Sequence, residues 1–140
     1  AEMPWKDYEG GEVVDAGRDG MMRKVNVPGH EGPVAVKQRN AEPQACQEAL
    51  TELQQRLSVR HPVLLGVLDC FRADEESVSW VESWCGGGCL GEIVQRLHAQ
   101  GRGALPSPIA LRYAGQLAEA LAHVHSQGAA HGGVALRNVW

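Results

Sequence analysis

The chain changes character once, at Gly86-Gly87-Gly88, and this change limits the folds open to it more than any other feature. Before the three glycines, short apolar runs separated by turn residues follow the pattern of strands, interrupted by a single helical stripe. After them, apolar residues recur at the three- and four-residue spacing of amphipathic helices. A strand-rich part followed by a helical part predicts an α+β fold with a connection at the glycines.

The first strand-like stretch covers residues 12–38. Apolar runs such as Val34-Ala35-Val36 are separated by two turns, the glycine-containing segment 15–20 and the polar segment 28–33. Three antiparallel strands joined by these turns are the simplest structure that fits this pattern.

The next segment has helical spacing and is followed by two more strands. Pro43 suits the first turn of the helix, and His61-Pro62 is expected to end it. Residues 63–71 and 78–84 have strand character, and the acidic turn 72–76 separates them. The apolar stripe of the predicted helix consists of Cys46, Leu50, Leu53 and Leu57.

Two helices are predicted after the glycines. The first is short and amphipathic, with Leu90 in its first turn, and ends near Gly101. The second has Ser107 as its N-cap, Pro108 at its first position and Gly128 as its C-cap glycine.

The composition is that of a globular chain with no polyanionic partner. It has 140 residues, of which 44% are hydrophobic and 21% charged, and a formal net charge of −4. An acidic balance argues against a general nucleic-acid surface or an anionic-membrane surface. No run of eighteen apolar residues is present, so membrane insertion is not expected.

The four cysteines do not have the spacing of a disulfide framework. Cys85 and Cys89 enclose three glycines and suggest a metal clip, but a zinc site needs about four ligands and no second cysteine pair follows. We therefore expect reduced cysteines and a cytoplasmic protein. His123 and His125 alternate near the end of the second predicted helix, and a metal site there is the less favoured interpretation.

Two motifs stand out within this order of elements. The first is Val34-Ala35-Val36-Lys37, and the second is the segment His-Gly-Gly-Val-Ala-Leu-Arg-Asn-Val-Trp at 131–140. Together with the order of strands and helices, they resemble the V-A-I-K and H-R-D-L-x-x-x-N motifs of the protein kinase domain, in its tyrosine-kinase or tyrosine-kinase-like form. The alternative, another α+β domain with accidental motifs, would lack five strands flanking one helix.

The resemblance implies a kinase-like architecture over nearly the whole chain. It predicts a five-stranded antiparallel N-lobe with one helix, followed by the first helices of an incomplete helical C-lobe. The implied divisions are an N-terminal extension at 1–11, the N-lobe at 12–85, and the hinge with the truncated start of the C-lobe at 86–140. We expect a fragment of a longer product, because the chain ends before an Asp-Phe-Gly segment.

The resemblance also assigns a cofactor site for ATP and Mg²⁺. Lys37 would pair with the α- and β-phosphates and with a helix glutamate, which we expect to be Glu52, with Glu48 as the alternative. Ala35 of the same motif belongs to this site.

The glycine loop of the family is matched less well. Gly17 and Gly20 correspond to its second and third glycines, and Met22 to its valine. Asp15 stands where the first glycine would be, and with Asp19 it adds negative charge near the expected phosphates.

The segment around the three glycines resembles the hinge of the family. Cys85 would offer its backbone groups to adenine, and Cys89 would lie near the ribose. In this register Glu82 occupies the gatekeeper position, which is normally apolar. A shift by one residue would instead make Val81 the gatekeeper and Glu82 the common hinge acid.

The catalytic loop departs from the family at its most important position. Gly133 stands where the catalytic aspartate belongs, and Gly132 replaces the preceding arginine, while His131 and Asn138 match. Asn138 would hold a Mg²⁺ ion. We therefore expect a pseudokinase that acts through regulatory contacts with a protein partner. The alternative is a fragment of an active ATP-dependent protein kinase that phosphorylates Ser, Thr or Tyr of proteins.

Overall fold

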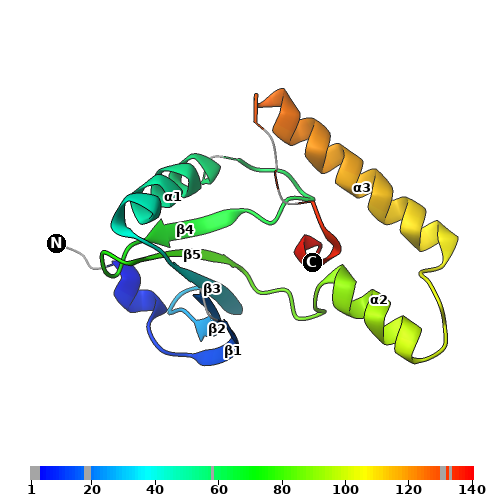
Figure 1. Cartoon of the computed structure of the whole chain (residues 1–140), viewed down its shortest axis with the longest axis horizontal. Helices are drawn as coiled ribbons and strands as arrows, with labels where there is room; N and C mark the ends of the chain where they lie inside the picture. The colour runs from blue at the N-terminus through cyan, green and yellow to red at the C-terminus, as the bar shows by residue number, and fades with distance from the viewer. Residues whose placement is uncertain (1–3, 18–19, 58, 130–131, 133) are drawn as a thin grey trace. The chain divides into compact units, whose positions relative to one another are not determined.

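The computed structural model describes residues 4–17, 20–57, 59–129, 132 and 134–140. The chain divides into two compact units (Figure 1). The first extends through Arg60 and also includes Leu65–Trp84, so it contains the sheet and the first helix. The second consists of His61–Leu64 and Cys85–Trp140 and contains the later helices.

The first unit is built on a five-stranded sheet, which confirms the predicted fold class. Every neighbouring pair of strands is antiparallel, and the spatial order is β1-β2-β3-β5-β4. The last strand in sequence therefore lies inside the sheet, between β3 and β4. The strands are β1 (Glu12–Gly17), β2 (Gly20–Asn26), β3 (Pro33–Asn40), β4 (Val67–Phe71) and β5 (Ser77–Ser83).

The fourth strand is shorter than the predicted segment 63–71, because β4 begins only at Val67. The residues before it form a local turn instead. The Leu64 amide donates to the His61 carbonyl at 3.1 Å, and the Val63 amide donates to His61 Nδ1 at 3.2 Å. These short-range bonds satisfy groups that a longer strand would have paired across the sheet.

One face of the sheet carries an apolar core, here called the valine cluster. Because side chains alternate along each strand, this face collects every second residue of β2, β3 and β5. The cluster consists of the buried residues Val25, Val34, Val36, Phe71 and Val81.

A short 3₁₀ helix that the sequence did not predict, η1 (Pro4–Tyr8), contributes a side chain to the valine cluster. The ring of Tyr8 stacks on Phe71 with centroids 5.6 Å apart, and its hydroxyl donates to Asp69 Oδ2 at 2.9 Å. Burial, the hydrogen bond to Asp69 and the charges of Asp69 and Asp7 raise the pKa of Tyr8 to about 12. This part of the expected N-terminal extension is thus attached to the sheet.

The opposite face of the sheet packs against α1 (Pro43–Arg56), as the apolar stripe predicted (Figure 1). Cys46 and Leu53 are buried against Val67 and Val78 of the sheet. The helix ends at Arg56, before the expected stop at His61-Pro62. The chain tightens there, because the Val59 amide donates to the Arg56 carbonyl three residues back.

The second unit contains α2 (Leu90–Ala99), α3 (Ser107–Ser126) and the 3₁₀ turn η2 (Leu136–Asn138). Ser107 is the first residue of α3 rather than its cap, because Pro106 precedes the helix and its carbonyl accepts from Ile109 and Ala110. Gly128 has a φ of 73°, as a glycine beyond a helix end requires. Among the described helices, none has the length and apolar character needed to span a membrane.

Candidate functional site

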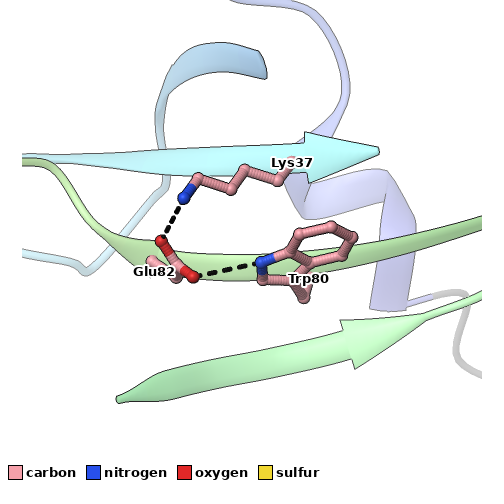
Figure 2. Close-up of polar contacts among 3 residues, drawn as sticks. All are labelled: Lys37, Trp80 and Glu82. Carbon is pink, nitrogen blue, oxygen red and sulfur yellow. Dashed lines mark hydrogen bonds and ion pairs between the residues drawn. The ribbon is translucent and has the colours of Figure 1, made fainter. Parts of the chain in front are cut away.

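The central pair of strands in the first unit brings Lys37 to a carboxylate. In the register of β3 and β5, Ala35 is paired with Glu82 and Lys37 with Trp80, so Lys37 and Glu82 are diagonal neighbours on one face. Lys37 Nζ lies 2.8 Å from Glu82 Oε2. Figure 2 shows the carboxylate between the ammonium of Lys37 and the indole of Trp80, whose Nε1 donates to Glu82 Oε1 at 3.1 Å.

The ion pair is largely shielded from water. The side chains of Lys37 and Glu82 are only 26% and 14% exposed. Trp80 also packs against the apolar residues under α1, which fixes its indole beside the carboxylate. A pair in this setting is screened less by salt than one on the surface, so Glu82 offsets part of the charge of Lys37.

The strand register decides which residue faces the lysine. Val81 is paired with Val36, and both belong to the valine cluster on the far side of the sheet. Glu82 therefore occupies the Lys37 side, and the choice between Glu82 and Val81 as the gatekeeper stays a prediction.

The expected helix glutamates have other partners. Glu52 is exposed and lies 3.0 Å from Arg56 Nη2, one turn along its own helix. The carboxylate of Glu48 accepts from Gln44 Nε2 at 2.9 Å. The pairing of Lys37 with Glu52 stays a prediction. The contact of Lys37 with Glu82 was not predicted. An alignment of β5 against β3 could have indicated it, because it places Glu82 diagonally opposite Lys37.

A small surface surrounds the ion pair on the same side of the sheet. Met22 is paired with Lys37, and Lys24 with Ala35, across β2 and β3. Ala35 is 4% exposed and leaves only a methyl group there. We call this surface the Lys37 face and define it by Met22, Lys24, Ala35, Lys37, Trp80 and Glu82.

The other lysine of the Lys37 face also has a partner. Lys24 Nζ lies 5.0 Å from the ring centroid of Trp84, a cation–π contact at the end of the first unit. A further carboxylate, that of Asp15, lies on the strand next to this face, because Asp15 is paired with Met22.

The two glycines of the predicted phosphate loop differ in their surroundings. Gly17 and Gly20 are paired with each other where β1 ends and β2 begins. Residues 18 and 19 between them lie outside the described residues. A Cβ on Gly20 would lie 2.2 Å from the Gln38 carbonyl oxygen, whereas one on Gly17 would meet nothing within 4 Å. Gly20 is therefore required by the close approach of β2 and β3, independently of any ligand.

The Lys37 face fits a nucleotide in part. Lys37 supplies an ammonium and Met22 a partly exposed apolar side chain, whereas Ala35 is almost wholly covered. The carboxylates of Glu82 and Asp15, however, oppose a phosphate chain.

The four cysteines form no disulfide with one another in the described part of the chain. Cys85 is half-buried, and Cys89 is 6% exposed where α2 begins. Burial and the nearby charge of Asp69 raise the pKa of Cys70, which keeps its thiol protonated. Within the described part of the chain, no three His, Cys, Asp or Glu side chains gather as a metal site.

Two residues of the degenerate loop lack a description in the structure. His131 and Gly133 lie outside the described residues, and Gly132 has a φ of 76°. Asn138 is exposed in η2, next to Val139, whose carbonyl accepts from the Leu90 amide at 2.6 Å. The start of α2 thus holds the turn that carries Asn138.

The histidines near the end of α3 have different surroundings. The ring of His123 lies against that of His61, with centroids 4.9 Å apart and a tilt of 35°. His125 is exposed. The contact of His123 is a packing contact within the second unit.

Comparison with known proteins places this geometry in a family. Residues 9–140 match the family described as protein tyrosine and serine/threonine kinase. No curated protein matches the chain by sequence. Among solved structures, the crystal structure of Rad53 1-466 in complex with AMP-PNP is similar, with a TM-score of 0.74 and 23% identity. The similarity covers 91% of this chain and 32% of that chain, so this chain spans about a third of it. With almost its whole length matched, the chain belongs to the protein tyrosine and serine/threonine kinase family.

Proposed function

We propose that the chain is part of a pseudokinase, a cytoplasmic signalling module that acts through contacts with protein partners and keeps a weakened nucleotide site. The observation that carries the proposal is Gly133, which stands where the family has its catalytic aspartate. Glycine has no group that can accept the proton of a substrate hydroxyl. General-base assistance contributes about 10²–10⁴-fold to such reactions, so its loss removes most of the transfer rate.

The retained residues support binding of a nucleotide in this proposal. Lys37 would contact phosphate oxygens, Met22 and Ala35 would lie against the base, and Asn138 would hold Mg²⁺. The backbone groups of Gly17, Gly20 and Cys85 would complete the site, and Glu52 would orient Lys37 after leaving Arg56. When bound, ATP with Mg²⁺ supplies a transferable phosphoryl group. The similar structure of Rad53 is a complex with AMP-PNP, which supports a nucleotide as the ligand.

The test separates binding from transfer in the full-length protein. Thermal-shift titration with Mg-ATP measures binding, and incorporation of labelled phosphate into a generic protein substrate measures transfer. We expect no transfer above that of the Lys37→Ala variant. Robust transfer that disappears in Lys37→Ala would contradict the pseudokinase proposal.

The second candidate is an active kinase with a divergent loop. Two retained residues favour it, because Lys37 and Asn138 are both residues that a phosphoryl-transfer enzyme needs. In that case the Gly133→Asp variant would change the transfer rate little, since another group would already serve as the base. In a pseudokinase, by contrast, Gly133→Asp should raise the rate of phosphoryl transfer.

A further inference from the structure

The ion pair of Lys37 with Glu82 has a consequence for the kind of ligand that the Lys37 face accepts. Both oxygens of Glu82 are engaged, one by Lys37 Nζ at 2.8 Å and one by Trp80 Nε1 at 3.1 Å (Figure 2). A phosphate that binds Lys37 must either displace this carboxylate or approach close to it. Displacement would leave a side chain that is 14% exposed with one charged partner fewer, which is unfavourable.

The other lysine of the face keeps its positive charge but is engaged by an aromatic ring. Lys24 is held over the ring of Trp84. On its β1 side, Met22 is paired with Asp15, which adds a second carboxylate next to the face. A polyanionic chain laid along β1 to β3 therefore approaches two carboxylates and two lysines that already have partners.

A ligand without phosphates avoids these costs. The partly exposed side chains of Met22 and Trp80 contribute apolar surface that does not depend on the charge of Lys37. The Lys37–Glu82 pair can then stay intact while the ligand is bound.

We propose that Glu82 is a specificity-determining residue that makes the nucleotide site prefer nucleosides or other uncharged heteroaromatic ligands over nucleoside triphosphates. This inference rests on the proposed nucleotide site and names its ligand class. Glu82 acts by neutralising Lys37 and by repelling phosphate, while Trp80 fixes the carboxylate in position.

The decisive variant is Glu82→Gln in the full-length protein. Glutamine keeps the size of the side chain and an oxygen that accepts from Trp80, but it removes the negative charge. Affinities for adenosine and for ATP, with and without Mg²⁺, are measured by isothermal titration calorimetry. We expect ATP to bind about tenfold more tightly, a factor equivalent to about 1.4 kcal/mol, while adenosine affinity changes little.

Two further variants serve as controls. Glu31→Gln makes the same charge change in the exposed turn between β2 and β3, and it should leave both affinities unchanged. The double variant Lys37→Met with Glu82→Gln should lose the gain for ATP, because the gain depends on the freed lysine. Glu82→Met repeats the comparison without charge if Glu82→Gln does not fold.

The outcomes distinguish this inference from the proposed function. If adenosine binds and removal of the Glu82 charge leaves ATP affinity unchanged or lower, the inference is wrong and the nucleotide site stands. If neither adenosine nor ATP binds to the wild-type protein or to the Glu82 variants, the nucleotide site itself is contradicted, and the inference falls with it.

Discussion

The two faces of the sheet are built from the same strands but have different chemistry. Val34 and Val36 of β3 point into the valine cluster, whereas Ala35 and Lys37, the alternate residues, belong to the Lys37 face. The first face carries the apolar valine cluster, against which Tyr8 packs, while the second holds a shielded ion pair. A single strand thus contributes to the apolar core with one set of side chains and to the proposed ligand site with the other.

The largest effect is expected from breaking the apolar face. Phe71→Ala removes a ring that is 8% exposed and stacked on Tyr8, so it should lower the free energy of unfolding by about 3–4 kcal/mol. Urea unfolding measures this. Leu68→Ala on the same strand, where the side chain is 41% exposed, should change it by less than about 0.5 kcal/mol. Equal losses from both variants would contradict the assignment of the core to this face.

The next effect tests the strand pairing that keeps both faces in register. Gly20→Ala places a Cβ 2.2 Å from the Gln38 carbonyl oxygen, so β2 and β3 must separate, at a cost of about 2 kcal/mol. Gly17→Ala meets nothing within 4 Å and should be close to neutral. Denaturant unfolding of the two variants gives the comparison. A neutral Gly20→Ala would show that the strands lie farther apart than described.

A smaller effect is expected where η1 covers the valine cluster. Tyr8→Phe keeps the stacking on Phe71 but loses the hydrogen bond to Asp69, which should cost about 1 kcal/mol at neutral pH. Folding raises the pKa of Tyr8 from 10.0 to about 12, so its protonated form is favoured in the folded state. The contribution of the Tyr8 hydroxyl to the free energy of unfolding is fully present below pH 10.0 and is lost as the pH rises through about 12.

The wild-type advantage over Tyr8→Phe should therefore shrink over this pH window. Unfolding curves of both proteins between neutral pH and pH 12 measure it. An advantage that is constant across the window would mean that the hydroxyl is solvated rather than bonded to Asp69.

The smallest effect concerns the outer surface of α1, on the same side of the sheet as the ion pair. Arg56→Ala removes only the exposed partner of Glu52, so stability should fall by about 0.3–0.5 kcal/mol. If Glu52 then draws Lys37 away from Glu82, Mg-ATP should stabilise the variant more than the wild type in a thermal-shift titration. An unchanged response would mean that Arg56 does not restrain Glu52.

Much of this architecture follows from local sequence patterns, and the remainder depends on long-range pairing. The stripe beginning at Cys46 predicted α1, because helical spacing is a local property. The motif ending at Lys37 was identified from consecutive residues. The contact with Glu82 depends instead on the pairing of β3 with β5, which no single segment specifies. The role of Tyr8 was missed for the same reason, since its partners Asp69 and Phe71 lie far along the chain.

The strand order also bears on how the chain reaches its folded state. β1, β2 and β3 are joined in sequence by short turns, but β3 can pair with β5 only after α1 and β4 have been looped out. Closing such a loop costs entropy before it gains contacts, so this step is expected to be late and slow. The Lys37–Glu82 contact forms only in that step. An early hairpin intermediate would therefore have a lysine without this carboxylate, and the site would be completed last.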